Sequence, residues 1–439
     1  MSKNRGRFDG GKSLIFTCLD MGIIKMRRSP LETTVYLLGV QSIGYLAPLY
    51  VMYFITRNVG VDFFGAYSYY LAISLLIQVV LDYGFNLSAA RDVAKPQLSI
   101  RAKSVIFSSV FGAKIIISVG VFSLALVYQL FSNNARPELW SAVLVAFLSS
   151  LVPNWYFQGV EDVRGISIAN AIGKVSFVIL VYAVAGPRST ISDFFLLNAL
   201  GLLIPLCWGM GKNHQLLVPH FMFSPRHLRN RFLSGRHIFT TSLASSILSN
   251  GPLLGIGFMS SAGGETVGIY AAVEKLVKSA SGIFAPVSQA LYPHNCRAYS
   301  ISHKSGVKST GITFLLFSFV GAISIGLILL GRRVLYALFN LPIGSDRFLF
   351  ILLPWLYLSI LNNALGIQGL SASGNSKIYA YCFNLVVALF IVIVYFLPAS
   401  IDASMKMPVS LLLSELTLFI LLVFAFKRVY QSGVKWNAH

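Results

Sequence analysis

The sequence predicts an all-α membrane protein with about twelve transmembrane helices in two six-helix lobes. Of its 439 residues, 56% are apolar and only 11% are charged, and the mean hydropathy is +0.72. The apolar residues form long continuous runs, whereas the strands of a membrane β-barrel alternate over about ten residues. A spanning helix needs roughly 20 apolar residues, so twelve helices fit this length.

The apolar runs define the expected spans in chain order. They cover residues 33–56, 65–86, 104–131, 138–159, 165–185, 191–211, 238–260, 266–292, 309–330, 348–370, 377–399 and 407–426. Charged residues lie near their ends: Arg57, Asp82, Arg136, Glu161, Arg188, Lys212, Glu265, Arg297, Arg332, Lys377, Asp402 and Lys427. The basic connection 212–237 separates an N-terminal lobe (31–211) from a C-terminal lobe (238–426). A basic arm (1–30) and a tail (427–439) complete the chain.

The distribution of positive charge predicts the orientation in the membrane. With the N-terminus inside, the inside segments hold 24 Lys and Arg residues, the outside loops hold seven, and four lie within spans. This excess places both termini in the cytoplasm. Nucleic-acid binding is not expected, because the charge is divided among short loops. The first 30 residues are expected to form a cytoplasmic arm. Alternatively, initiation occurs at Met21 or Met26, which would leave a short basic start before the first span.

No cofactor, metal site or catalytic residue is expected. The four cysteines are widely spaced and the seven histidines lie in predicted cytoplasmic segments without ligand spacing. The chain has no glycine-rich phosphate loop and no H-E-x-x-H or G-x-S-x-G motif.

Internal similarity supports the division into two lobes. Residues 58–67 align with 261–270, so that two glycines and a tyrosine coincide, and residues 157–159 resemble 367–369. Because each half has six spans, the halves share one orientation. A repeat of this kind places a binding site between the lobes near the middle of the membrane.

The eighth span carries three charges where the second span is nearly apolar. At about 100° per residue, Glu274, Lys278 and Gln289 fall on one side of the helix and Lys275 lies at its margin. Lipid cannot satisfy such a stripe, so this side is expected to line a water-filled interior. The spacing of four also allows Glu274 and Lys278 to form a salt bridge that fixes helix packing.

Two further lysines lie within predicted spans. In the fifth span, Lys174 shares a face with Ser167 and Asn170, and Lys114 lies in the third. Each ammonium group either extends to the nearer interface or faces a cavity.

Single charged residues mark other spans. Asp82 is expected to pair with Arg91 or to cap the following loop, and Arg91 is also a candidate for substrate binding. Arg57 is either an interface anchor or a substrate contact. Glu415, alone in the last span, is either a carboxylate that titrates during coupling or a neutral acid bonded to a neighbouring helix.

Five segments carry a resemblance to a known family. They are residues 82–94 (DYGFNLSAARDVA), 153–161 (PNWYFQGVE), 268–276 (GIYAAVEKL), 289–293 (QALYP) and 365–370 (LGIQGL). In this order they resemble the motifs of the polysaccharide transport (Wzx-type) family, the O-antigen or repeat-unit flippases. That family belongs to the multidrug/oligosaccharidyl-lipid/polysaccharide (MOP) exporter superfamily.

The resemblance implies a flippase of the bacterial inner membrane. Its substrate would be an undecaprenyl-pyrophosphate-linked oligosaccharide, moved from the cytoplasmic to the periplasmic leaflet through a cationic cavity. A polysaccharide polymerase and a chain-length regulator are the implied partners. The candidate residues are Lys275, Lys278, Lys174, Lys114, Arg57 and Arg91 for the pyrophosphate, Glu274, Asp82 and Glu415 for coupling or charge pairing, and Asn170, Gln289, Asn362 and Asn363 for the sugars.

Other functions stay open at this point. From the residues alone, helix packing is favoured over sugar contact for Asn362 and Asn363, since amides contribute roughly 1 kcal/mol between membrane helices. A multidrug or cation antiporter of the same superfamily would share the fold, although an anionic cavity would suit cationic drugs better. A membrane glycan polymerase or ligase would be expected to have a larger polar loop outside.

Overall fold

A computed structural model describes residues 30–96, 98–132, 136–259, 264–282, 284–398 and 400–432. The predicted arm, apart from Pro30, and the end of the predicted tail lie outside these residues. The chain divides into two units, Met1–Gly39 and Val40–His439. In the first unit, only the beginning of one helix is described.

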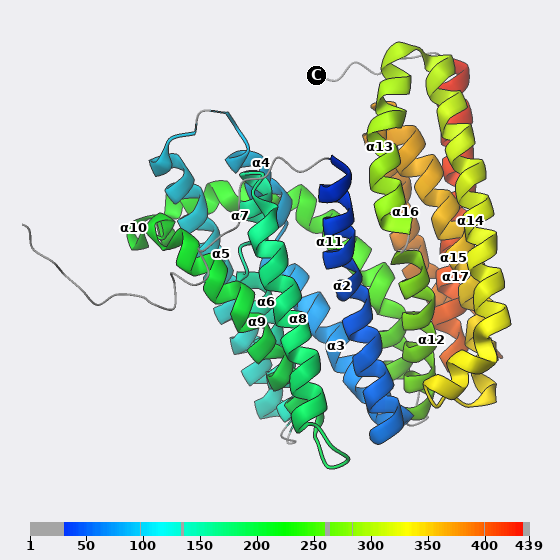
Figure 1. Ribbon diagram of the computed structural model, residues 1–439, viewed down its shortest axis with the longest axis horizontal. Helices are drawn as coiled ribbons and strands as arrows, with labels where there is room; N and C mark the ends of the chain where they lie inside the picture. Colours follow the sequence, from blue (N-terminus) through cyan, green and yellow to red (C-terminus); the bar gives the residue numbers. More distant parts are fainter. Residues whose placement is uncertain are drawn as a thin grey trace, which may run out of the picture. The chain divides into compact units, whose positions relative to one another are not determined.

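All regular structure in the described residues is helical (Figure 1). The N-terminal helices are α2 (Pro30–Asn58), α3 (Val61–Asp82), α4 (Phe85–Val93), α5 (Ile100–Phe131), α6 (Pro137–Leu151), α7 (Asn154–Gly159), α8 (Val163–Val184) and α9 (Ile191–Asn213). The connection holds η1 (His214–Leu216) and α10 (Pro219–Met222). The C-terminal helices are α11 (Pro225–Met259), α12 (Gly264–Gly282), α13 (Phe284–Ile301), α14 (His303–Leu338), η2 (Ile343–Ser345), α15 (Asp346–Leu365), η3 (Gly366–Ser371), α16 (Ser376–Phe396) and α17 (Ala403–Ser432).

Nine helical segments of the described chain are long and apolar enough to cross a membrane, which confirms the all-α membrane class. They correspond to nine of the twelve predicted spans. The other three, 33–56, 238–260 and 266–292, fall on α2, on α11, and on α12 with α13. The count of twelve and the sidedness of the termini stay predictions.

Local sequence explains where several helices begin and end. Asp82 ends α3 because Tyr83 (φ 42°) and Gly84 (φ 72°) adopt left-handed conformations that stop the helix. The predicted span 65–86 is therefore divided between α3 and α4. At α9, Thr190 and Asp193 form a reciprocal capping box that fixes the first turn.

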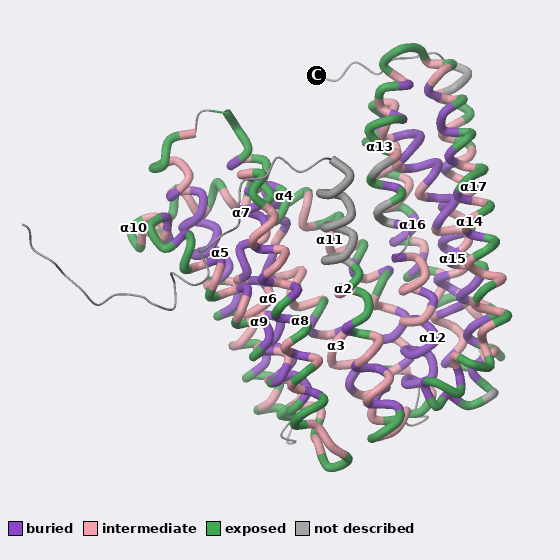
Figure 2. The backbone as a smooth tube through the Cα atoms, viewed as in Figure 1, coloured by how far each residue is buried: buried purple, intermediate pink, exposed green. Residues whose placement is uncertain are grey.

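Exposed apolar residues identify the surface that faces lipid. On α14, for example, Leu315, Phe319 and Leu330 are 70%, 66% and 86% exposed. Figure 2 shows that exposed and intermediate residues make up most of α14 and α16. Such a face is unfavourable in water and suits hydrocarbon.

The two halves of the predicted repeat meet where α3 packs against α12 (Figure 1). Phe64 and Tyr270 are fully buried near this contact, and the Tyr270 ring lies 5.5 Å from that of Phe348. A Cβ atom at Gly65 would lie 2.6 Å from the backbone N of Gly268. These two glycines are an aligned pair of the repeat, and the absence of side chains allows the two backbones to approach closely.

Replacing Gly65 with alanine is expected to destabilise the protein. The added methyl group would lie 2.3 Å from the carbonyl oxygen of Gly264, so the helices would have to separate. Overpacking of this kind costs roughly 1–3 kcal/mol, which thermal unfolding in detergent would detect. Gly120→Ala on α5 is the matched control, because nothing lies within 4 Å of its added atom. Equal melting temperatures for the two variants would contradict this account of the α3–α12 contact.

Candidate functional site

A buried ion pair connects α3 with α5. Lys114 Nζ lies 2.8 Å from Asp82 Oδ1 and also donates to the carbonyl of Ser150 on α6. Lys114 is only 1% exposed, so its ammonium group is not available to a substrate in this structure. The pair corrects two predictions: Asp82 binds Lys114 rather than Arg91, and Lys114 neither extends to the interface nor lines a cavity.

Arg91 lies on the surface of α4, and its neighbour forms the ion pairs there. Asp92 contacts Arg231 at 2.8 Å and Lys95 at 3.1 Å. The side chains of Asp92 and Arg231 are 13% and 15% exposed, and they connect α4 to the beginning of α11. Arg91 itself is exposed. Its proposed contact with a substrate therefore belongs to this surface and not to the lobe interior.

Two of the three charged side chains on the predicted polar side of α12 form an ion pair with each other. Lys278 Nζ lies 3.1 Å from Glu274 Oε1, the pair expected from their spacing of four. Tyr270 Oη donates to the same oxygen at 3.2 Å, and Glu274 is 6% exposed. Lys278 also donates to the carbonyl of Ser249 on α11, at 2.6 Å. The side chain of Lys278 is nevertheless 33% exposed, so one face of it is open to a ligand.

Lys275 forms no ion pair with any described residue. Its ammonium group lies 5.3 Å from the centre of the Phe64 ring on α3, a cation–π contact across the interface of the halves. The next residue along that helix is Gly65, at the closest approach of the two backbones. Lys275 thus lies in an apolar setting without an acidic partner among the described residues, and the Phe64 ring is the contact that faces its ammonium group.

Lys174 on α8 likewise makes no salt bridge in the part of the chain that the structure covers. It is exposed, and a Cβ built on Gly44 of α2 would lie 3.1 Å from its Nζ. The next residue, Tyr45, lies against Gly282 at the end of α12. The middle of α2 therefore contacts both Lys174 and the helix that carries Lys275. Asn170 is held by a 2.8 Å bond from its Nδ2 to Asn154 Oδ1.

Arg57 joins the end of α2 to the end of α14. Its guanidinium group donates to the carbonyls of Leu338 at 3.2 Å and Ala337 at 3.1 Å. A cation at a helix C-terminus satisfies unpaired carbonyl groups and interacts favourably with the helix dipole. The structure therefore gives Arg57 a helix-joining contact at the predicted outside end.

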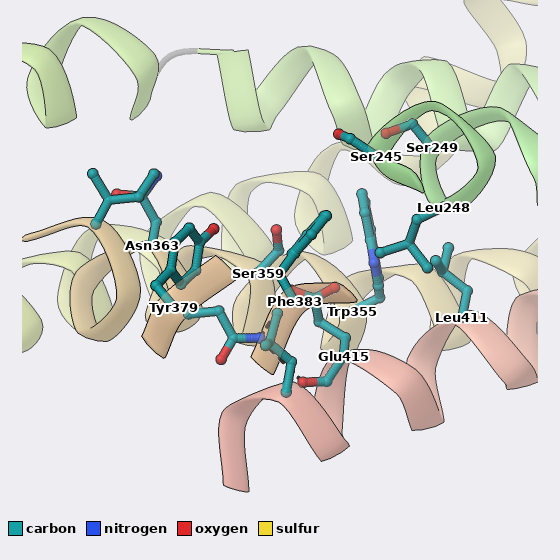
Figure 3. Close-up of a pocket in the computed structure, with 13 residues that line it drawn as sticks. Ser245, Leu248, Ser249, Trp355, Ser359, Asn363, Tyr379, Phe383, Leu411 and Glu415 are labelled. Atoms are coloured by element: carbon teal, nitrogen blue, oxygen red, sulfur yellow. Dashed lines mark hydrogen bonds between the residues drawn. The ribbon is translucent and has the colours of Figure 1, made fainter. Parts of the chain in front are cut away.

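Glu415 lies beside a cavity of about 180 Å³ inside the C-terminal lobe. Figure 3 shows Ser245 and Ser249 on one side and Ser359, Trp355 and Glu415 on the other. Glu415 is 6% exposed.

Asn362 holds this carboxylate in place. Its Nδ2 donates to Oε1 of Glu415 at 2.9 Å and to the backbone carbonyl of Glu415 at 3.1 Å. These two hydrogen bonds connect α15 with α17.

Sequence reasoning missed Trp355 and Ser359 as cavity residues. Together with Asn362 they follow the spacing i, i+4 and i+7 on α15, which places them on one helix face. This periodicity was a usable signal. The aromatic contribution of Tyr379 on α16 had no such signal, because it depends on how α16 packs.

A chain of buried amides and hydroxyls leads from Asn363 into the lobe. Asn363 Oδ1 accepts from Ser288 Oγ at 2.8 Å, and Ser288 Oγ in turn accepts from Gln368 at 2.8 Å. Gln368 Oε1 accepts from Asn295 at 2.9 Å. Gln368 lies in the π-helical turn η3, a rare element that is frequently found at functional sites. Gln289, the remaining predicted amide, is exposed.

No group of three or more His, Cys, Asp or Glu side chains capable of holding a metal ion occurs among the described residues. The polar side chains that the structure brings together in the site are lysines, carboxylates, amides and hydroxyls. Such groups bind and orient a ligand.

Comparisons with known proteins agree with this picture. The family model for polysaccharide biosynthesis proteins matches residues 31–298. A putative O-antigen transporter of Escherichia coli (strain K12) is 25% identical over 348 residues, covering 77% of this chain and 82% of that protein.

Two solved structures share the fold. An inward-facing multidrug transporter of the MATE family, in the MOP superfamily, has a TM-score of 0.68 at 12% identity and covers 89% of this chain and 96% of its own. The lipid II flippase MurJ, in an inward closed conformation, has a TM-score of 0.66 at 13% identity, with 93% and 94% covered. Since the family model spans more than half of the chain, this protein belongs to the family of polysaccharide biosynthesis proteins, with the fold of the MOP transporters.

Proposed function

We propose that this protein flips an undecaprenyl-pyrophosphate-linked oligosaccharide, the repeat unit of O-antigen or another surface polysaccharide, from the cytoplasmic to the periplasmic leaflet. The observation that carries the proposal is that Lys275 and Lys174 have no acidic partner in the described structure. Both lie in predicted spans, where an uncompensated charge is costly and marks a pathway. The family and the putative O-antigen transporter among its relatives support this substrate class.

The sign of the charge distinguishes the candidate substrates. A pyrophosphate carries about two negative charges and needs cations to enter the membrane interior. A cationic drug would instead be repelled by Lys275 and Lys174, although the fold is shared with multidrug transporters. A glycan polymerase is disfavoured by connections such as residues 185–190, which join α8 to α9 with little room for a catalytic loop.

The proposed movement is a rocking of the two lobes around the substrate. Two contacts lie at the predicted outside end, one between Gly65 and Gly268 and one between Arg57 and α14. Both would separate when the space between the lobes opens to the outside. Asp82 and Glu274, both paired with lysines, would keep each lobe rigid during the motion. Glu415 is the proposed coupling carboxylate, because it is a buried acid beside a cavity within one lobe.

We place the protein in the bacterial inner membrane, with a polysaccharide polymerase and a chain-length regulator as partners. Both statements follow from the proposed substrate, which is made at the cytoplasmic leaflet and polymerised outside.

Transport in proteoliposomes tests the proposal. Vesicles containing the full-length protein would carry lipid-linked repeat units from the native host with a fluorescent label on a sugar. An impermeant quencher then reports the fraction of label in the outer leaflet. We expect label from the inner leaflet to become quenchable only when the protein is present. Uptake of a cationic dye such as ethidium, without movement of the lipid, would favour the antiporter and overturn the proposal.

A further inference from the structure

We infer that the cavity beside Glu415 binds the sugar attached directly to the pyrophosphate, an inference that rests on the proposed function. The cavity lies between α11 and the helices α15, α16 and α17 (Figure 3). Its volume is about 180 Å³. Pockets for drug-sized ligands measure roughly 300–1,000 Å³, so the size of this one suits a single sugar ring.

The walls combine the two surfaces that a sugar ring requires. Trp355, Tyr379 and Phe383 supply aromatic rings, whose negative faces attract the C–H groups of a pyranose. Ser245 and Ser249 place hydroxyl groups on the opposite wall, toward the hydroxyl rim of the ring. A largely apolar lining with a few convergent polar groups is typical of small-molecule sites.

One buried atom on the wall lacks a partner. Oδ1 of Asn362 is buried and accepts no hydrogen bond from any residue that the structure describes, while its Nδ2 is held by Glu415 at 2.9 Å. An unsatisfied buried acceptor is costly, so a hydroxyl donor that reaches this atom would be stabilised. Asn363, the next residue, also lines the cavity. Its side-chain Oδ1 accepts the hydrogen bond from Ser288, which leaves its NH₂ group as a donor on the same wall.

The position of the cavity matches the connectivity of the substrate. In a sugar pyrophosphate, the phosphate is bonded to the ring itself, so the site for the first sugar must adjoin the site for the phosphate. Ser249 lines the cavity, and its carbonyl accepts a 2.6 Å hydrogen bond from Lys278. Lys275, which forms no ion pair with any described residue, lies one turn from Lys278 on α12. A phosphate at these lysines would therefore place its sugar at the cavity.

A monovalent cation is the competing occupant, because a carboxylate and several oxygen atoms also suit a cation. The three aromatic side chains and the volume favour a sugar, since apolar walls supply no ligands to a cation.

Binding to the purified full-length protein in nanodiscs tests the inference. The probes are farnesyl pyrophosphate and farnesyl pyrophosphate linked to glucose, galactose, N-acetylglucosamine or N-acetylgalactosamine. We expect at least one sugar-bearing probe to bind about tenfold more tightly than farnesyl pyrophosphate, which is roughly 1.4 kcal/mol. Equal affinities for all five probes would overturn the inference.

Two variants locate the gain in affinity. Ser245→Leu, at an exposed position, is expected to fill the cavity and remove the gain, while farnesyl pyrophosphate binds as before. Asn363→Ala should lower the gain in the same way. Thr241→Leu is the matched control, because Thr241 is exposed one turn earlier on α11 and does not line the cavity. A gain that survives Ser245→Leu would overturn the inference.

The remaining outcomes separate this inference from the proposed function. Sodium binding that is lost in Glu415→Gln, without any gain from a sugar, would assign the cavity to a cation. Farnesyl pyrophosphate that binds with the same affinity to wild type and to Lys275→Ala would count against the proposed function itself. The sugar inference would then fail with it.

Discussion

The double variant Lys174→Ala/Lys275→Ala is expected to lower transport of lipid-linked repeat units by about 100-fold or more. Each lysine would supply a charge-assisted hydrogen bond to the pyrophosphate, worth roughly 1.5–3 kcal/mol. Losing both costs about 3–6 kcal/mol, and every 1.4 kcal/mol is tenfold. The fold should be unaffected, because neither lysine forms an ion pair with a described residue.

Surface polysaccharide in a strain carrying the variant is the measurement, with protein abundance as a check. Lys304→Ala, on an exposed residue of α14, is the matched control. Lys278 is left for a further variant, since its removal would also strand the buried Glu274 carboxylate. If the alanine variants of Lys174, Lys275 and Lys278 combined left polysaccharide at the wild-type level, the cationic pathway would be wrong.

Replacing Lys114 with methionine should unfold much of the N-terminal lobe or strongly destabilise it. The change leaves Asp82 as an unpaired carboxylate that is 9% exposed. Breaking a buried ion pair from one side costs roughly 3–5 kcal/mol. Thermal unfolding in detergent should therefore show a large drop in melting temperature.

The double variant Asp82→Leu/Lys114→Met provides the informative comparison. Removing both charges is often nearly neutral, so most of the lost stability should return. Arg231→Met is the matched control at a more exposed pair, where Asp92 retains Lys95 and the effect should be smaller. A double variant no more stable than Lys114→Met alone would show that the pair does not act as described.

Hydropathy predicted the fold class because every helix that spans the lipid needs a run of roughly 20 apolar residues. Hydropathy could not locate helix ends that lie beyond the lipid. The expected span 266–292 corresponds to two helices, α12 and α13, and α13 continues past the expected end to Ile301. It also missed the stop after Asp82, which depends on the left-handed backbone of Tyr83 and Gly84.

Partners within one helix were predictable, whereas partners on different helices were not. Glu274 and Lys278 are four residues apart, and their ion pair follows from helical geometry. Asp82 and Lys114 are separated by 32 residues, and Asn362 and Glu415 by 53. No spacing rule connects such positions, because the packing of whole helices decides which side chains meet.

The most direct measurement of the central claim is the leaflet location of lipid-linked repeat units after deletion of this gene in the native host. We predict loss of surface polysaccharide, with single repeat units trapped at the cytoplasmic leaflet. Unpolymerised units on the periplasmic side would contradict flipping and indicate a role in polymerisation or ligation instead.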